Sequence, residues 1–190
     1  MKNFPLALCL ATFALVAAPG LLPAQDTWLT PAQTGPHGSA PGMKVQLLAQ
    51  NGAEKTYAVI FHTGDEAYSG LYQFARQYHV TAAHFTAIGA LSGARIAWFD
   101  PTRKMYKQNI LHQQIEVLSM VGDIALSNGV PAVHTHMVVG LPDGTTRGGH
   151  VLEADVRPTL EVMVTVEPIA MHRVPDSATD LTLIEPTATK

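Results

Sequence analysis

The sequence predicts a single α/β (α+β) domain with a mostly antiparallel sheet packed by one or two helices. Most of its apolar segments alternate with polar residues, as half-buried strands do. Asn51-Gly52 separates two such segments and is a strong hairpin sequence. Only the segment from about Glu66 to Tyr78 places its apolar residues at helical spacing.

The first residues predict export. Lys2 precedes an apolar run, Phe4–Leu22, that Pro5 and Pro19-Gly20 interrupt, so the uninterrupted span is too short for a transmembrane helix. We therefore expect residues 1–24 to be a signal peptide, the mature protein to be periplasmic or secreted, and no membrane association after cleavage. The chain's one cysteine, Cys9, would be lost with this peptide, which would leave no thiolate ligand.

The remaining chain divides by composition. Residues 25–43 are rich in Pro, Gly, Ser and Thr and predict a flexible leader. Residues 44–168 predict one domain with its own core. Residues 169–190 predict a loosely ordered tail.

Within the domain, turn residues delimit the expected elements. A first hairpin is expected over Val45–Ala49 and Tyr57–His62, before the helix. The later strands are expected at Thr81–Leu91, Ala94–Phe99, Ile110–Leu126, Ala132–Leu141, Thr145–Ala154 and Thr159–Glu167.

Charge argues against nucleic-acid binding. The chain has 12 Lys and Arg against 15 Asp and Glu, a net charge of −3, and its basic residues form no run. A nucleic-acid interface needs clustered positive charge to neutralise phosphates. We therefore expect no nucleic-acid partner.

Three histidines predict a metal site. His134 and His136 lie two residues apart in a predicted strand, so they share a face. Pro142-Asp143-Gly144 fits a three-residue hairpin loop, which would place His136 directly opposite His150, with Cβ atoms about 5 Å apart. Three neutral imidazoles with one open position form the ligand set of a catalytic zinc site, so the expected cofactor is a divalent metal, preferably zinc. A single strand histidine is more often a packed or surface residue.

Two carboxylates are candidates to act beside the histidines. A tight turn at Asp155–Pro158 would place Glu161 on the histidine face as a catalytic residue. A turn at Ser127–Val130 would place Asp123 opposite His134, where it could orient that imidazole or act as a general base. Alternatively, Asp123 is a surface residue or pairs with Arg147 or Arg157.

Five motifs, in order, resemble the plants-and-prokaryotes-conserved (PPC) domain family, over roughly residues 44–168. They are Ala87-Ile-Gly-Ala-Leu91, Glu116-Val-Leu-Ser-Met-Val-Gly-Asp-Ile124, Gly129-Val-Pro-Ala-Val-His-Thr-His136, Gly148-Gly-His-Val151 and Pro158-Thr-Leu-Glu-Val162. The resemblance implies an antiparallel α/β fold, a homotrimer, and metal binding through the residues matching His134, His136 and His150. Plant members carry a DNA-binding AT-hook before the domain, and residues 25–43 contain no such element.

Two functional classes follow. One is an exported, metal-dependent hydrolase or lyase that acts on a small polar metabolite. The other is a non-catalytic module that binds a metal or a small-molecule ligand. An open coordination position beside a concave pocket would favour the enzyme.

Overall fold

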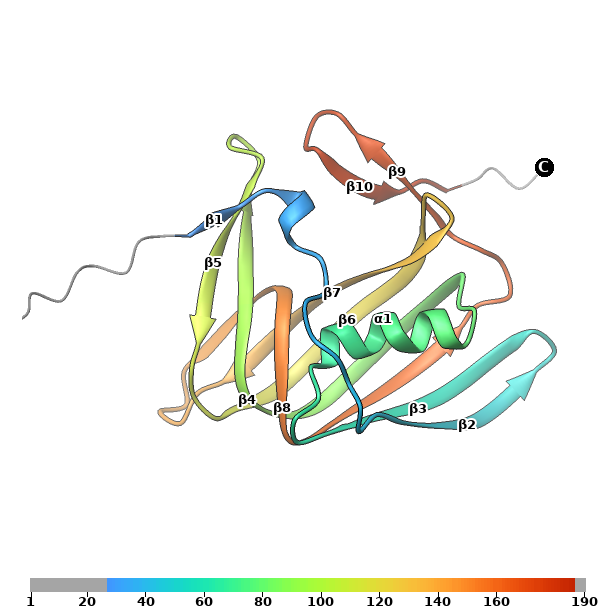
Figure 1. The fold of residues 1–190 in the computed structure, drawn as a ribbon, viewed down its shortest axis with the longest axis horizontal. Helices are drawn as coiled ribbons and strands as arrows, with labels where there is room; N and C mark the ends of the chain where they lie inside the picture. Colours follow the sequence, from blue (N-terminus) through green and yellow to red (C-terminus); the bar gives the residue numbers. More distant parts are fainter. Residues whose placement is uncertain (1–26, 187–190) are drawn as a thin grey trace, which may run out of the picture.

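A curved, mostly antiparallel sheet with one α-helix beside it forms the protein (Figure 1). The structure is a computed structural model that describes residues 27–186. It confirms the predicted single domain with one helix. The expected signal peptide lies outside the described residues. No helix within residues 27–186 is long and apolar enough to cross a membrane.

Within the described residues the strands vary widely in length. They are β1 (Trp28–Leu29), β2 (Lys44–Asn51), β3 (Glu54–His62), β4 (Ala82–Asp100), β5 (Met105–Leu111), β6 (Ile115–Ser127), β7 (Val130–Gly140), β8 (Thr146–Val166), β9 (His172–Asp176) and β10 (Leu181–Ile184). A 3₁₀ helix covers Pro31–Gln33 and the α-helix, α1, covers Ala67–Gln77.

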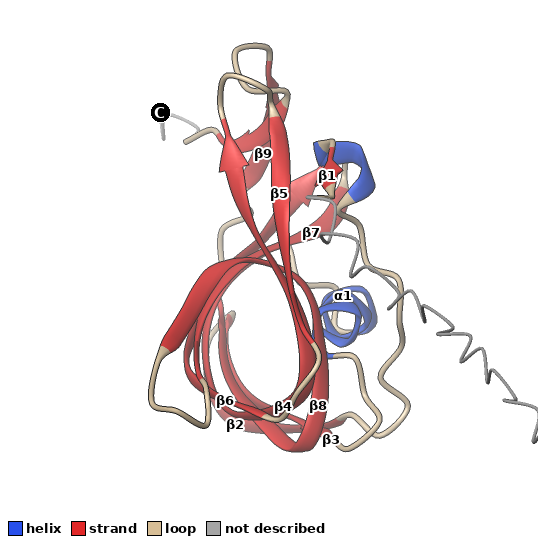
Figure 2. Ribbon diagram, turned by 90° about the vertical axis from the view of Figure 1, so that its left-hand side faces the viewer, coloured by secondary structure: helices blue, strands red, loops and turns tan. Residues whose placement is uncertain are grey.

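The strand order closes part of the sheet into a ring. The main order is β1-β5-β4-β6-β7-β8-β3-β2, and β4 pairs with β8 as well. Strands β4, β6, β7 and β8 therefore form a closed circuit, which Figure 2 shows end-on. The pairing of β6 with β9 is parallel and short, whereas the other pairings are antiparallel.

Strand β8 corrects the turn predicted at Asp155–Pro158. The chain stays extended from Thr146 to Val166, so Ala154 does not pair with Thr159. The segment before α1 satisfies the backbone at this point: Val156 donates from its N–H to the Asp65 carbonyl, and Gly64 donates to the Val156 carbonyl. Asp155 and Pro158 thus lie at a bend within a long strand rather than in a hairpin loop.

Two other predicted boundaries are also wrong. Ser92-Gly93 does not separate two strands, because β4 runs through it with register shifts against β8. Conversely, the strand expected at Ile110–Leu126 is two strands, β5 and β6, and β5 begins at Met105. Register shifts let a long strand bend without ending, which local sequence does not reveal.

Helix α1 begins where the sequence predicts. The Glu66 carboxylate accepts hydrogen bonds from the N–H groups of Tyr68 and Ser69, at 2.9 and 2.7 Å, and caps the helix. The same carboxylate accepts from Ala154 N–H of β8 at 2.9 Å, which ties the helix to the sheet. The apolar face of α1, with Leu71 and Phe74 fully buried, packs into the main core.

The segments outside residues 44–168 contain short secondary-structure elements. The expected leader supplies β1, which pairs with β5, and the 3₁₀ helix. The expected tail supplies β9 and β10, which pair with each other. Figures 1 and 2 place β1 and the β9–β10 hairpin at the same end of the molecule.

Candidate metal centre

The β7–β8 hairpin has the predicted register. His136 pairs directly with His150, and Leu141 N–H donates to the Thr145 carbonyl at 2.9 Å to close the loop. Gly144 has a φ of +81°, a left-handed conformation that glycine adopts without steric cost. Local loop chemistry therefore positions the histidines.

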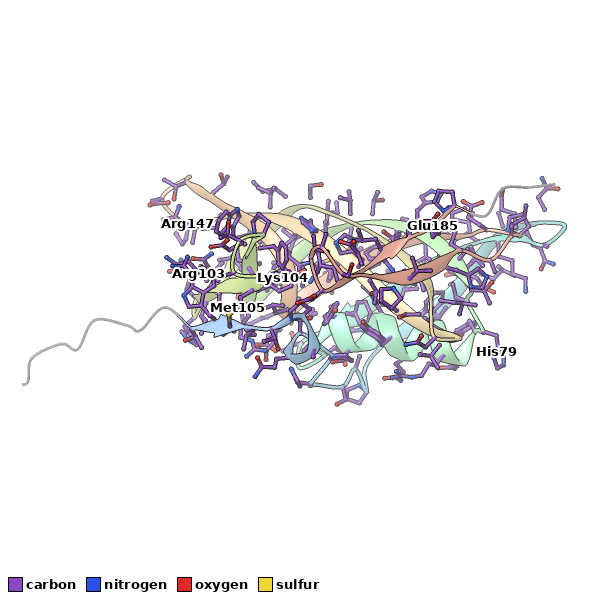
Figure 3. All side chains as sticks on the ribbon, turned by 90° about the horizontal axis from the view of Figure 1, so that it is seen from above. His79, Arg103, Lys104, Met105, Arg147 and Glu185 are labelled. Atoms are coloured by element: carbon purple, nitrogen blue, oxygen red, sulfur yellow. The ribbon has the colours of Figure 1, made fainter. Side chains whose placement is uncertain are left out.

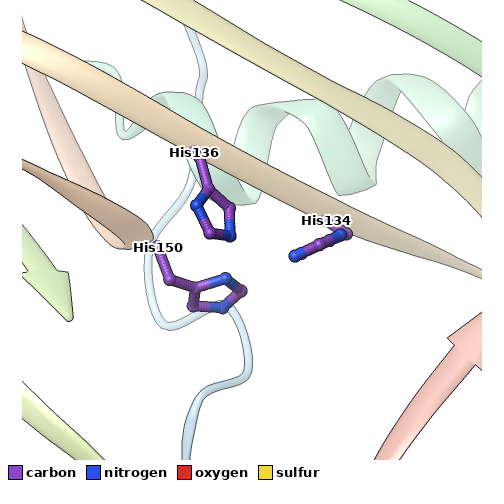
Figure 4. A group of neighbouring side chains, drawn as sticks. All are labelled: His134, His136 and His150. Atoms are coloured by element: carbon purple, nitrogen blue, oxygen red, sulfur yellow. The ribbon is translucent and has the colours of Figure 1, made fainter. Parts of the chain in front are cut away.

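The three histidines converge. One ligand atom from each of His134, His136 and His150 lies within 4.8 Å of the others. The ring centroids are 5.1 to 5.3 Å apart. Figure 4 shows a ring nitrogen of each residue turned toward a common point. Within residues 27–186 this is the group of His, Cys, Asp or Glu side chains whose geometry suits a metal ion.

His150 is the most buried member. Its exposed fraction is 8%, its ring stacks on Tyr106 at 4.9 Å between centroids, and its Nδ1 has no hydrogen-bond partner. Burial, together with the nearby His134, His136 and Arg173, lowers the pKa of His150 to about 3. Burial and His134 also lower the pKa of His136. Both imidazoles are therefore kept neutral, as metal ligands must be.

A glycine lets β8 approach β4 at His150. A Cβ on Gly149 would lie 2.5 Å from the Ala97 carbonyl oxygen, closer than any side chain allows. Ala97 pairs with His150 across the same strands. The Gly148-Gly149 pair thus serves close backbone packing.

A carboxylate supports His134 from behind. Asp123 pairs with His134 as predicted, and its Oδ2 lies 3.6 Å from His134 Nδ1. Asp123 Oδ1 accepts a hydrogen bond from Arg173 Nη2 of strand β9. Burial would raise the pKa of Asp123, but the contacts and charges of His134 and Arg173 outweigh it and lower the pKa. With Nδ1 facing a carboxylate, the Nε2 of His134 is left for a ligand.

A cavity of about 480 Å³ adjoins the histidines. His134 and His150 line it, together with Tyr68, Tyr106 and Arg173. Burial raises the pKa of both tyrosine hydroxyls, so both stay protonated. The site therefore combines imidazoles with neutral phenols beside a space for a small molecule.

The structure does not bring Glu161 to the histidines. Because the turn at Asp155–Pro158 is absent, Glu161 does not pair with Leu152; it pairs with Ile60 of β3 and Ile88 of β4. Strands β4 and β6 lie between this part of β8 and β7. Glu161 lines a separate cavity of about 320 Å³.

Sequence reasoning missed Arg173 and the contact of Tyr106. Arg173 lies in the expected tail, 50 residues from Asp123, and no local pattern marks it. Tyr106 packs against Ala97 and Leu152 and also lines the cavity wall. One alternative from the sequence paired Asp123 with Arg147 or Arg157. The basic partner of Asp123 in the structure is Arg173.

Fold and site together define a small α/β protein with a three-histidine cluster beside a cavity. The chain belongs to the Plants and Prokaryotes Conserved (PCC) domain family, whose model matches residues 48–168. No curated protein matches the chain significantly.

Three solved structures illustrate the similarity. A protein from Ralstonia eutropha JMP134 with a proposed DNA-binding role is 30% identical, with a TM-score of 0.65, and the match covers 69% of this chain and 91% of that one. A plant- and prokaryote-conserved protein from Pyrococcus horikoshii is 26% identical, with a TM-score of 0.66 and coverage of 77% and 97%. A metal-containing protein from Archaeoglobus fulgidus is 27% identical, with a TM-score of 0.65 and coverage of 76% and 98%.

Proposed function

We propose that His134, His136 and His150 bind one divalent metal ion, with zinc preferred. The carrying observation is the convergence of three ligand atoms within 4.8 Å, one of them from a buried histidine whose Nδ1 has no partner. A similar protein, that from Archaeoglobus fulgidus, is described as metal-containing. Zinc bound at about 2.1 Å by each nitrogen needs about 3.4 Å between nitrogens in tetrahedral geometry. The rings would therefore draw together by at most about 1.4 Å.

The proposed site keeps one coordination position open. No carboxylate or thiol joins the cluster within residues 27–186, because Asp123 faces the far side of His134 and paired Arg173 holds it there. Three protein ligands and an open position are typical of catalytic zinc, whereas structural sites have four protein ligands. The open position favours an enzyme over a purely structural site.

We further propose metal-dependent hydrolysis or lyase chemistry on a small polar metabolite. A bound metal of this kind activates water or polarises a carbonyl. The chain's own groups would orient the site: Asp123 fixes the tautomer of His134, and Tyr106 fixes the ring plane of His150. The adjoining cavity of about 480 Å³ supports a small-molecule substrate. The alternative is a non-catalytic module that binds a metal or a small ligand with the same residues.

DNA binding is not proposed, although the Ralstonia relative has that proposed role. The net charge of −3 and the absence of a basic run in the sequence disfavour contact with phosphates. Filter-binding of duplex DNA at low salt should show no affinity above that of a neutral control protein.

We propose a homotrimer, as the family resemblance implies. An apolar patch supports this assembly: Ile88, Leu118, Val121, Val138 and Met163 are each at least 43% exposed. Val121 pairs with His136, so a second copy covering the patch would lie near the metal ligands. Light scattering should give three times the monomer mass, and a concentration-independent monomer would rule the trimer out.

Export to the periplasm or beyond the cell is also part of the proposal. It rests on residues 1–24 alone. Mass spectrometry of native protein should find a mature chain beginning near Gln25 or Asp26, and an intact Met1 in a cytosolic fraction would contradict it.

Metal analysis tests the central proposal. Protein purified without added metal and then equilibrated with zinc should bind one ion per chain, and a triple His→Ala variant should bind none. A substrate screen with and without a chelator then separates enzyme from binding module. Glu161→Gln is a useful variant there: loss of activity would support the role first predicted for Glu161, whereas unchanged activity fits its place in a separate cavity.

A further inference from the structure

The cavity beside the histidines has walls that the family domain does not provide. Residues Pro31–Gly35 form one wall, apart from Gln33, and residues Asp180–Leu183 form another. Both stretches lie outside residues 48–168, which the family model matches. Next to the histidines the walls come from the domain itself, except for Arg173 of β9. At about 480 Å³ the space is within the usual range for small-molecule sites.

The C-terminal wall is firmly anchored. Lys104, at the turn between β4 and β5 (Figure 3), donates to the Ser177 carbonyl at 2.8 Å and to Asp180 at 3.0 Å. Arg173 Nη1 donates to the Thr182 carbonyl, while its Nη2 binds Asp123. The hairpin is thus tied both to the sheet and to the carboxylate behind His134.

The histidine end of the cavity is suited to an anion. The Arg173 side chain lines it and is only 7% exposed, and its Nε has no hydrogen-bond partner. Each nearby carboxylate is already paired, Asp123 with Arg173 and Asp180 with Lys104. A dipositive ion on the histidines would therefore leave this end with net positive charge.

The flanking walls are suited to hydrocarbon. Ala32, Leu181 and Leu183 line the cavity from the two flanking segments, and Val133 lines it from β7. Leu183 is 43% exposed on the protein surface, so a ligand would cover apolar area that otherwise faces water.

From this juxtaposition we propose that the protein takes a carboxylic acid with an apolar body. The carboxylate occupies the open metal position, and the hydrocarbon lies between residues 31–35 and the β9–β10 hairpin. This inference rests on the proposed metal site and narrows its small polar metabolite to one with an ionised head and an apolar chain.

Calorimetry of zinc-loaded full-length protein with acetate, butyrate, hexanoate and hexanol tests the ligand class. Affinity should rise about fourfold for each added CH₂, which is the fold-change for about 0.8 kcal/mol. Hexanol, which lacks the anion, should bind at least tenfold more weakly than hexanoate. Equal affinity for acetate and hexanoate, or for hexanol and hexanoate, would overturn the proposal.

Variants in the apolar flanking walls distinguish the role of these walls from that of the metal. Leu183→Ser, which removes an apolar wall, and Ala32→Trp, which fills the space, should each weaken hexanoate binding at least fivefold and leave zinc affinity unchanged. Ile184→Ser is the matched control, because Ile184 is similarly exposed, at 36%, on the same strand but does not line the cavity. Equal hexanoate affinity in all three variants would contradict the assigned walls.

The two proposals can fail separately. If the wild-type protein binds no zinc, the metal proposal fails, and hexanoate is titrated into the metal-free protein. Hexanoate binding that depends on Leu183 would then support the ligand pocket without a metal ion. No hexanoate binding would overturn both proposals. Zinc binding without chain-length dependence would overturn only the ligand class.

Discussion

His150 and His134 reach the same point from opposite kinds of surroundings. His150 is buried, stacked on Tyr106 and without a hydrogen-bond partner at Nδ1. The His134 side chain is 44% exposed and faces Asp123, which Arg173 holds in turn. Packing orients the imidazole of His150. A pair of charged residues, Arg173 and Asp123, orients the imidazole of His134, and we call this pair the relay.

The difference teaches how a site can keep its ligands both neutral and fixed. Burial disfavours the imidazolium, which lowers the pKa of His150 to about 3, but offers no hydrogen bond to select a tautomer. A carboxylate selects the tautomer and the ring orientation. Each histidine lacks the device that the other has, so the two should respond differently to substitution.

The largest expected effect follows removal of the buried ligand. His150→Ala should lower zinc affinity by more than about 100-fold, beyond the usual cost of losing a supporting residue. Calorimetry or competition with a chelating dye measures it. His112→Ala is the control, because His112 is exposed and belongs to no cluster with the three histidines. Stoichiometric tight zinc in His150→Ala would break the comparison.

Removing the charge of the relay should have the next largest effect. Asp123→Asn should lower zinc affinity about 10- to 100-fold, because His134 loses the carboxylate that orients it. Glu116→Gln, a carboxylate-to-amide change at an exposed position of the same strand, is the matched control. If both variants bind zinc as the wild type does, the relay does not position His134.

Acid should destabilise the metal-free protein mainly through His150, the buried histidine. The folded pKa of His150, about 3, lies below the unfolded value of 6.5, so between these values the unfolded chain binds a proton that the folded chain does not. The free energy of unfolding should therefore fall as pH falls from 6.5 toward 3, by about 1.4 kcal/mol per pH unit for one proton. The lowered pKa of His136 acts in the same direction.

Urea unfolding of chelator-treated protein at pH 6, 5 and 4 measures this slope. His150→Gln should reduce the slope of unfolding free energy against pH by the contribution of about one proton. His112→Gln should leave this slope as in the wild type. An unchanged slope in His150→Gln would mean that burial does not suppress protonation of His150.

The smallest effect is expected from the ring that packs on His150. Tyr106→Leu removes the stacking contact and should cost about 0.5–1.5 kcal/mol, equivalent to a loss in zinc affinity of no more than about tenfold. Tyr106→Phe keeps the ring and should bind zinc as the wild type does. A larger loss in Tyr106→Phe would assign the role to the hydroxyl group instead.

The parts that sequence could predict are those that local chemistry decides. Pro142-Asp143-Gly144 sets the β7–β8 register, and the turn at Ser127–Val130 sets Asp123 opposite His134. The helix begins at its capping Glu66. In each case the deciding residues lie within a few positions of the feature that they determine.

The parts that sequence could not predict depend on distant partners. Asp155–Pro158 has turn residues, yet Asp65 and Gly64 satisfy the backbone of Val156 and the strand continues. The predicted position of Glu161 depended on that turn. Because the turn is absent, Glu161 pairs with Ile60 of β3 instead. Arg173 reaches Asp123 only because β9 runs beside β6, a pairing of two residues that no local pattern indicates.

The separate origin of ligands and walls bears on how such a protein could be redesigned. The three histidines belong to one hairpin of the family domain, whereas the far wall of the cavity is a short terminal hairpin tied on by Lys104 and Arg173. Exchanging residues 174–184 while keeping Arg173 would leave the metal ligands and their relay in place. New ligand preferences could then be selected from libraries confined to those few positions, with metal content as the check that the centre is intact.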